Sequence, residues 1–187
     1  LPVAGANADM KTFTPDSSIV SDVIPSMNYG ERNNGRIADM ILLHYTGMPD
    51  AEGAIAQLCT AGTDVSAHYI VLEDGRIVQS VPESKRAWHA GASYWAGEED
   101  INSCSIGIEI INPGHDWGYP DFPLRQIAAV IALCRGIMLR RNIPSHRVLA
   151  HSDVAPARKR DPGEKFPWHS LANSGVGHWV QPAPIVR

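Results

Sequence analysis

The sequence has few cysteines and no long apolar run. Only Cys59, Cys104 and Cys134 occur in 187 residues, and no two of them form a C-x-x-C pair. An odd number at this spacing argues against a disulfide framework and a thiolate zinc site, so we expect reduced, mostly buried thiols. No segment approaches the roughly 18 to 20 uncharged apolar residues of a transmembrane helix, so we expect no integral membrane segment.

Positive charge is also scarce. The chain has 16 Lys and Arg against 20 Asp and Glu, giving a formal net charge of −4, and it has no basic stripe. Proteins that bind nucleic acids usually carry such a stripe or patch, because it neutralises backbone phosphates. We therefore expect no nucleic-acid partner.

A secretory signal is not visible at the start of the sequence, which lacks a basic region followed by an apolar stretch. Two explanations stay open. Residues 1–9 are an added extension before a native start at Met10, or a leader has been removed before Leu1. The first predicts a cytoplasmic protein and the second a periplasmic one, and we favour the first.

The length of 187 residues, with 44% apolar and 19% charged residues, predicts one globular domain. Residues 1–36 are rich in Ser, Asn, Pro and Gly without periodicity, which predicts an irregular arm packed on the domain. The domain then spans residues 37–180, and residues 181–187 form a C-terminal tail.

Short apolar strands alternate with amphipathic helices along this domain. Asp50 is a candidate N-cap for a helix to about residue 61, and Pro144 ends the strongest helical pattern. We expect strands at 40–44, 67–72, 76–81, 105–111 and 148–150, helices at 51–61 and 124–141, and a long aromatic loop at 82–102. This order predicts an α/β fold with a mixed central β-sheet flanked by helices.

Polar residues follow three of the predicted strands. His44 and His151 stand at strand ends, and Glu109 projects from a face that Gly107 leaves open. Asp161 follows His151 by ten residues, across a segment that is too irregular for a helix. Catalytic zinc needs three nitrogen or carboxylate ligands and one open position. His44, His151 and Asp161 meet this requirement.

Five ordered motifs resemble one known family. They are ILLHYT (41–46), SAHYIV (66–71), AWHAG (87–91), SIGIEI (105–110) and HSDVAPARKRDPG (151–163). Together they resemble the N-acetylmuramoyl-L-alanine amidases of the AmpD and AmiD type, which are related to phage lysozyme amidases and peptidoglycan-recognition proteins. The resemblance implies their fold and a zinc-dependent hydrolysis of the amide between the muramic acid lactyl group and L-alanine.

The resemblance also assigns roles to residues. It implies that His44, His151 and Asp161 bind Zn²⁺, that Glu109 relays a proton, and that Lys159 stabilises the negative charge on the reacting oxygen. Candidate substrate contacts are Tyr45, Trp88, His89, Asn112 and Arg158. The last of these resembles a position that contacts acidic groups of the stem peptide.

Several alternatives stay open. His68 is more readily explained as a structural residue beside the site, and His89 as either a structural residue or a substrate contact. The rival functions are a non-catalytic peptidoglycan-binding module and a zinc peptidase acting on the stem peptide. Intact peptidoglycan, soluble muropeptides and their 1,6-anhydro forms are all candidate substrates. We expect a monomer.

Overall fold

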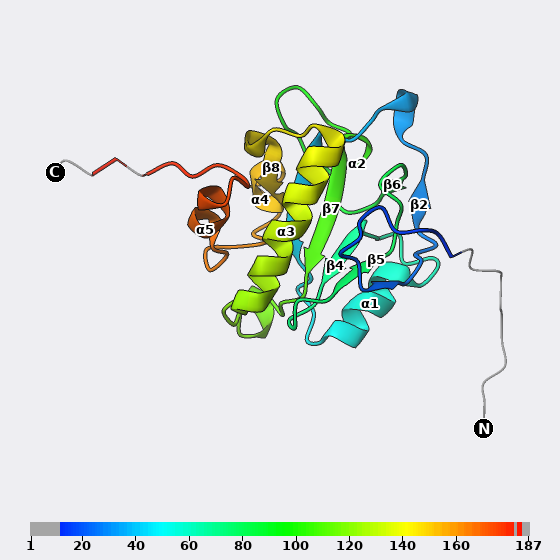
Figure 1. Cartoon of the computed structure of the whole chain (residues 1–187), viewed down its shortest axis with the longest axis horizontal. Coiled ribbons are helices and arrows are strands. Elements are labelled where there is room, and N and C mark those ends of the chain that lie inside the picture. The colour runs from blue at the N-terminus through cyan, green and yellow to red at the C-terminus, as the bar shows by residue number, and fades with distance from the viewer. Residues whose placement is uncertain (1–11, 182, 185–187) are drawn as a thin grey trace.

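A six-stranded sheet forms the centre of the protein in the computed structural model, which describes residues 12–181, 183 and 184 (Figure 1). Its strand order is β1-β5-β4-β7-β3-β8. The strands are β1 (Asp22–Val23), β3 (Met40–Tyr45), β4 (Tyr69–Val71), β5 (Ile77–Gln79), β7 (Ser105–Ile110) and β8 (Val148–Ala150). β4, β7, β3 and β8 run parallel, whereas β5 is antiparallel to β4. The predicted mixed α/β sheet is confirmed.

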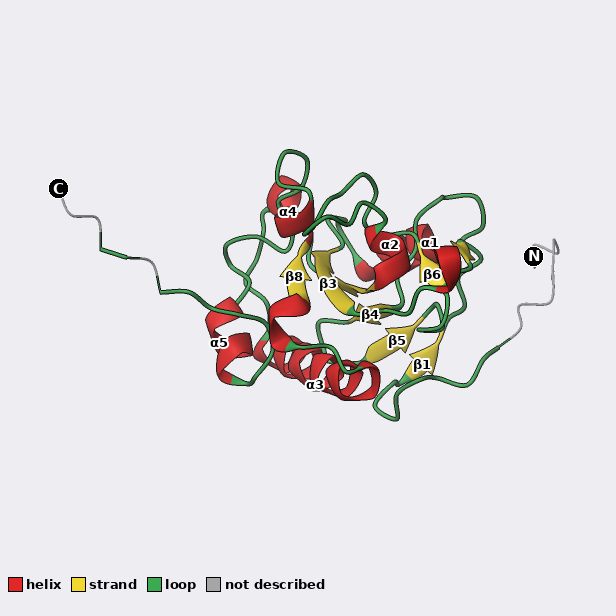
Figure 2. Ribbon diagram, turned by 90° about the horizontal axis from the view of Figure 1, so that it is seen from above, coloured by secondary structure: helices red, strands yellow, loops and turns green. Residues whose placement is uncertain are grey.

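Helices cover both faces of the sheet (Figure 2). The long helix α3 (Leu124–Arg141) packs on one face, while α1 (Ala51–Cys59), α2 (Ile101–Cys104) and α4 (His151–Val154) lie on the other. Helix α5 (Trp168–Asn173) lies near the β8 edge, and η1 (Asn33–Gly35), η2 (His115–Trp117) and η3 (Ser145–Arg147) are 3-10 turns. Ile41 and Leu43 of β3 therefore enter one core together with the isoleucines of β7, whereas Met40 and Leu42 of β3 enter a second core on the other face.

The two main helices follow local signals in the sequence. Asp50 caps α1 by accepting a hydrogen bond from the Gly53 backbone N–H at 2.7 Å, and the helix ends two residues earlier than predicted. The bounds of α3 are those predicted. Its end is set by Asn142, which adopts a left-handed conformation with φ 54°, before Pro144 is reached.

Other elements differ from the expectations. The hairpin strands β4 and β5 are three residues each, shorter than predicted. The loop 82–102 contains β6 (Arg86–Ala87), which pairs with β2 (Tyr29–Gly30), and its end belongs to α2. The segment after β8, predicted to be irregular, begins with the helical turn α4.

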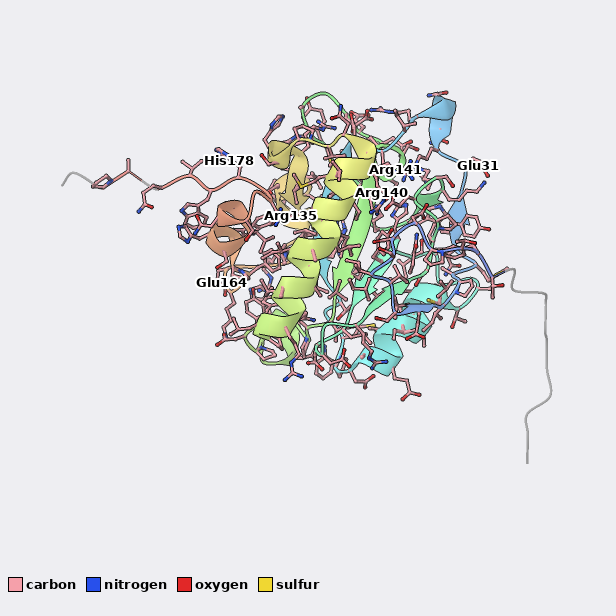
Figure 3. The ribbon with its side chains drawn as sticks, in the orientation of Figure 1. Glu31, Arg135, Arg140, Arg141, Glu164 and His178 are labelled. Atoms are coloured by element: carbon pink, nitrogen blue, oxygen red, sulfur yellow. The ribbon has the colours of Figure 1, made fainter. Side chains whose placement is uncertain are left out.

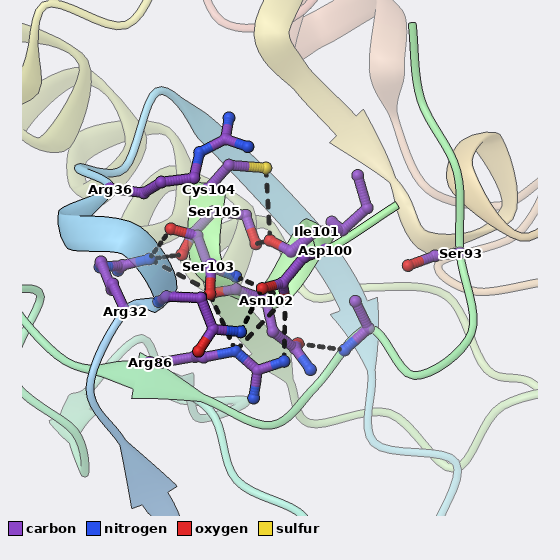
Figure 4. Close-up of polar contacts among 12 residues, drawn as sticks. Arg32, Arg36, Arg86, Ser93, Asp100, Ile101, Asn102, Ser103, Cys104 and Ser105 are labelled. Carbon is purple, nitrogen blue, oxygen red and sulfur yellow. Dashed lines mark hydrogen bonds and ion pairs between the residues drawn. The ribbon is translucent and has the colours of Figure 1, made fainter. Parts of the chain in front are cut away.

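The N-terminal arm packs on the domain and contributes two short strands that the sequence did not predict. Residues 21–26 run along the outer edge of β5 and contribute β1. The buried Arg32 donates hydrogen bonds to the backbone carbonyls of Ser103 and Ser105, both at 3.0 Å (Figure 4), and to the Glu83 carbonyl at 2.8 Å. These bonds attach the arm to α2 and β7. The extension predicted at residues 1–9 lies outside the described residues, as do residues 182 and 185–187.

Two further expectations concern the cysteines and the membrane. Cys104 and Cys134 are buried and Cys59 is partly buried, and all three are free thiols, as predicted. Among the described residues, no helix is both long and apolar enough to cross a membrane.

Candidate metal and catalytic centre

The parallel strands β3 and β7 bring two of the predicted site residues side by side. In their register His44 pairs with Glu109. Both follow Leu42 and Gly107 at a spacing of two, so their side chains lie on the sheet face opposite α3. β8 on the other side of β3 ends at Ala150, which places His151 at the same edge of the sheet.

His44, His151 and Asp161 form a compact buried group. His44 Nδ1 lies 2.9 Å from His151 Nδ1 and 3.2 Å from Asp161 Oδ2, and the last two atoms are 3.0 Å apart. Ligands about 2.0 to 2.1 Å from a tetrahedral zinc ion would be separated by about 3.3 Å. The donor set and its spacing therefore suit a tetrahedral metal ion, and the three residues can hold one.

Asp161 reaches the histidines because the chain after α4 turns back on itself. The Ser152 backbone N–H donates a hydrogen bond to the Asp161 carbonyl at 3.0 Å, which closes the loop between the two ligands. On the far side, the Tyr119 hydroxyl donates to the Pro162 carbonyl at 2.7 Å. Backbone contacts at Asp161 and at the next residue therefore hold this ligand in place.

The electrostatics favour the protonation states that bind a metal. Burial, reinforced by the neighbouring His151, lowers the pKa of His44 to about 4, so its imidazole is neutral at pH 7. Burial acts to raise the pKa of Asp161, but hydrogen bonds from His151 and His44 outweigh it and hold that pKa below its usual range. A neutral imidazole and an ionised carboxylate are the forms that act as ligands.

Glu109 lies beside this group, and the pKa of its carboxyl is shifted. Burial, together with the negative charge of Asp161, raises its pKa well above the ordinary value. Its Oε2 atom is enclosed and has no hydrogen-bond partner among the described residues. An unpaired carboxyl oxygen with a raised pKa is suited to taking up a proton and giving it back.

The group opens into a cleft of about 420 Å³, within the usual size of a small-ligand site. Most of the predicted site residues line it. They are His44, Tyr45, Trp88, His89, Glu109, His151, Arg158, Lys159 and Asp161. Lys159 is partly buried between Arg158 and Arg160, which are exposed. The structure therefore brings all of these residues together at one cleft.

Asn112 is the exception among the predicted site residues. It is buried and does not line the cleft. Its amide nitrogen donates to the Pro120 carbonyl at 2.9 Å and its oxygen accepts from the Gly114 N–H at 2.9 Å. Both ends of the amide hold the loop that follows β7, so the structure does not bring Asn112 to the cleft with the other predicted site residues.

Arg158 also has a contact that the sequence did not suggest. Its Nη2 donates to the backbone carbonyls of Ala90 and Ala92 at 2.7 and 2.8 Å. The Arg158 guanidinium therefore links residues 158–160 to the aromatic loop 82–102, while Arg158 still lines the cleft.

Sequence reasoning missed a second set of residues near Tyr45. The Tyr45 hydroxyl lies 2.9 Å from His115 Nδ1, and His115 Nε2 lies 2.9 Å from Glu164. His115 also stacks on Tyr119, with ring centroids 4.2 Å apart. No local pattern connects residues so distant in the chain. The cleft-lining Met48 and Asp116 were missed for the same reason.

Comparison with known proteins agrees with this geometry. A family model described as N-acetylmuramoyl-L-alanine amidase matches residues 33–164. The AmiD amidase of Escherichia coli K12 is 40% identical over 152 residues, which are 75% of this chain and 54% of AmiD. The chain therefore spans about half the length of that relative. The 1,6-anhydro-N-acetylmuramyl-L-alanine amidase AmpD of Citrobacter freundii is 35% identical over 163 residues, 78% of this chain and 84% of AmpD.

The fold agrees as well. A solved structure of E. coli AmiD in complex with the substrate anhydro-N-acetylmuramic acid-L-Ala-D-gamma-Glu-L-Lys superposes with a TM-score of 0.71 at 35% identity. The match covers 81% of this chain and 67% of that one. The family model, the relatives and the site together show that the chain belongs to the N-acetylmuramoyl-L-alanine amidase family.

Proposed function

We propose that the protein is a zinc-dependent amidase that hydrolyses the bond between the muramic acid lactyl group and L-alanine. The single observation that carries this proposal is the buried group of His44, His151 and Asp161 at the base of a cleft. Glu109 beside it favours an enzyme over a non-catalytic binding module, because a binding module needs no buried carboxyl with a raised pKa.

Each of these residues has a separate role in the proposed reaction. A zinc ion held by His44, His151 and Asp161 would lower the pKa of a coordinated water towards about 7 and polarise the amide carbonyl. Glu109 accepts a proton from the attacking water and passes it to the leaving L-alanine nitrogen. Lys159, which lines the same cleft, stabilises negative charge on the carbonyl oxygen.

The proposed substrate is a soluble muropeptide that carries the anhydro sugar. Support comes from AmiD, whose solved complex contains anhydro-N-acetylmuramic acid attached to a tripeptide. Tyr45, Trp88 and His89 line the cleft and are the proposed contacts for the sugar and the peptide. Because soluble recycled fragments are the form that a cytoplasmic enzyme meets, we propose a cytoplasmic location, and we also propose a monomer.

Metal analysis and product identification test this function together. We expect about one zinc per chain, and mass spectrometry of an anhydro-muropeptide digest should show intact free peptide. Binding without released peptide would make the protein a binding module. Release of single amino acids with the muramyl linkage intact would make it a peptidase.

A comparison of substrates tests the finer proposal. Equal amounts of anhydro-muropeptide and intact sacculi are digested, and released peptide is measured over time. Faster release from the soluble fragment supports the proposal, whereas faster release from sacculi would contradict both the substrate and the compartment.

A further inference from the structure

One short segment contacts both histidines of the metal group. The atoms that face the metal position are His44 Nδ1 and His151 Nδ1, so each ring has its Nε2 free for another partner. His44 Nε2 lies 3.0 Å from His89 Nδ1, and His151 Nε2 lies 2.9 Å from the Ala90 carbonyl. Consecutive residues therefore contact the remote nitrogens of both rings.

These contacts define a consistent set of tautomers. A ring that binds a metal through Nδ1 carries its proton on Nε2. His44 then donates to His89 Nδ1, so the proton of His89 lies on its own Nε2. That nitrogen is 3.3 Å from the Ser105 hydroxyl, which in turn donates to the Ile101 carbonyl at 2.5 Å. The chain of donors ends on a backbone acceptor.

The contacting segment is itself held in place. The Asn102 side-chain oxygen accepts from the backbone N–H groups of His89 and Ala90 at 3.0 and 2.8 Å. Figure 4 shows Ile101, Asn102 and Ser105 within one group of polar contacts. Space for the ring is provided by Gly107, since a Cβ there would come within 2.4 Å of His89 Cγ. The ring of His89 thus has one well-defined position.

We propose that His89 is a positioning residue that orients His44 for metal binding, an inference that rests on the proposed metal function. The Nδ1 atom of His89 accepts the Nε2–H of His44, which fixes the tautomer and the rotation of that ring. Such outer contacts typically change metal affinity by about 10- to 100-fold. The role differs from a substrate contact, because it acts on the protein before any substrate is bound.

Two variants of His89 separate these roles. His89→Leu keeps bulk but removes the acceptor, whereas His89→Asn keeps an acceptor oxygen in the place of Nδ1. Zinc affinity is measured by chelator competition, and KM and kcat are measured at saturating zinc. The matched control is His146→Leu, because His146 is exposed and lies outside the cleft.

We expect the Leu variant to bind zinc about 10- to 100-fold more weakly and the Asn variant to recover most of that loss. The control should bind as the unchanged protein does. Unchanged zinc affinity in His89→Leu, with or without a raised KM, would overturn the positioning role. If that variant does not fold, as judged by circular dichroism of the metal-free protein, Ser105→Ala replaces it. Removing the acceptor for His89 Nε2 should lower zinc affinity by a smaller factor, and unchanged affinity would again overturn the proposal.

The result is separable from the proposed function. If the unchanged protein binds no zinc, the proposed metal function fails. If it binds zinc tightly and the variants bind equally well, only the positioning role fails.

Discussion

Gly107 lies in the middle of β7, directly under the ring of His89. The strand needs no special backbone conformation at this position, so the requirement for glycine comes from the neighbouring side chain. Any larger residue would displace the ring of His89 and, through it, the contact with His44. A position without a side chain is therefore part of the site.

Replacing Gly107 with Ala should destabilise the protein by about 1 to 3 kcal/mol, the usual effect of overpacking. Zinc affinity should fall as well, because His89 is displaced. Urea denaturation and chelator competition measure the two effects. Gly136→Ala is the control: it lies within α3, where the new methyl group meets only the flexible end of Arg140, and it should be neutral or slightly stabilising. Equal behaviour of the two variants would contradict the crowding at Gly107.

Glu109→Gln should lower kcat by about 10²- to 10⁴-fold, because the amide cannot accept and return the proton. Zinc content should stay unchanged, since Glu109 is not one of the ligands. Turnover of the anhydro-muropeptide and metal analysis are the measurements. Glu73→Gln, an exposed carboxyl in the hairpin turn, serves as the control. Undiminished turnover in the Glu109 variant would remove this residue from the mechanism.

The sequence predicted the strand positions of the central site residues. It placed His44 at a strand end and Glu109 on a strand face that Gly107 leaves open, and the structure shows in addition that the two residues pair across neighbouring strands. The contact of His89 with His44, and the loop contacts of Asn112, depend on segments far apart in the chain. Side-chain partners of this kind are set by tertiary packing, so no local pattern indicates them.

At the scale of elements, α3 is joined to the sheet by an ion network around an enclosed carboxylate. The Glu83 carboxylate follows β5, is fully enclosed, and accepts hydrogen bonds from Tyr69, Arg140 and Arg141, each at 2.7 Å. Figure 3 shows the two arginines next to each other at the C-terminal end of α3. Cations at this end of a helix also interact favourably with its dipole.

Glu83→Ala should lower the free energy of unfolding by about 1 to 3 kcal/mol, because it leaves the buried Tyr69 hydroxyl without its acceptor and the two partly exposed arginines without their anion. Chemical denaturation of the metal-free protein measures this loss. Glu73→Ala, which removes an exposed carboxyl, should change stability by less than about 0.5 kcal/mol. A loss of similar size in both variants would mean that the network contributes little.

The accuracy of the predicted elements depended on their length. The 18 residues of α3 carry several turns of apolar periodicity, and its bounds were predicted correctly. β1 and β2 have two residues each and carry no periodic signal. Such strands form because a neighbouring edge supplies hydrogen-bond partners, which only the folded sheet reveals.

At the scale of the whole molecule, a buried histidine makes stability depend on pH. Burial, together with the nearby charge of Arg32, lowers the pKa of His68 to about 3. In the unfolded chain the pKa of histidine is about 6.5. Between these values the unfolded chain binds a proton that the folded protein excludes, so stability is lost as the pH falls from about 6.5 towards 3.

His68 should contribute about 1.4 kcal/mol to this loss for each pH unit within that range. Because other groups titrate there too, the measurement is the difference between the unchanged protein and His68→Gln. Urea denaturation of both, in the presence of a chelator, is repeated from pH 7 to pH 4. The variant should show the shallower dependence, and parallel curves would contradict the assignment.

The pairing of residues 21–26 with β5 has a consequence for solubility. The backbone N–H groups of Ser21, Ile24 and Ser26 donate to the β5 edge and the residue after it. β1 becomes the new edge, but it is short, and Pro25 after it has no N–H to offer a further strand. A chain shortened to begin at residue 27 would expose the edge of β5 to a second copy. We expect that chain to self-associate in light scattering, at concentrations where the full chain does not.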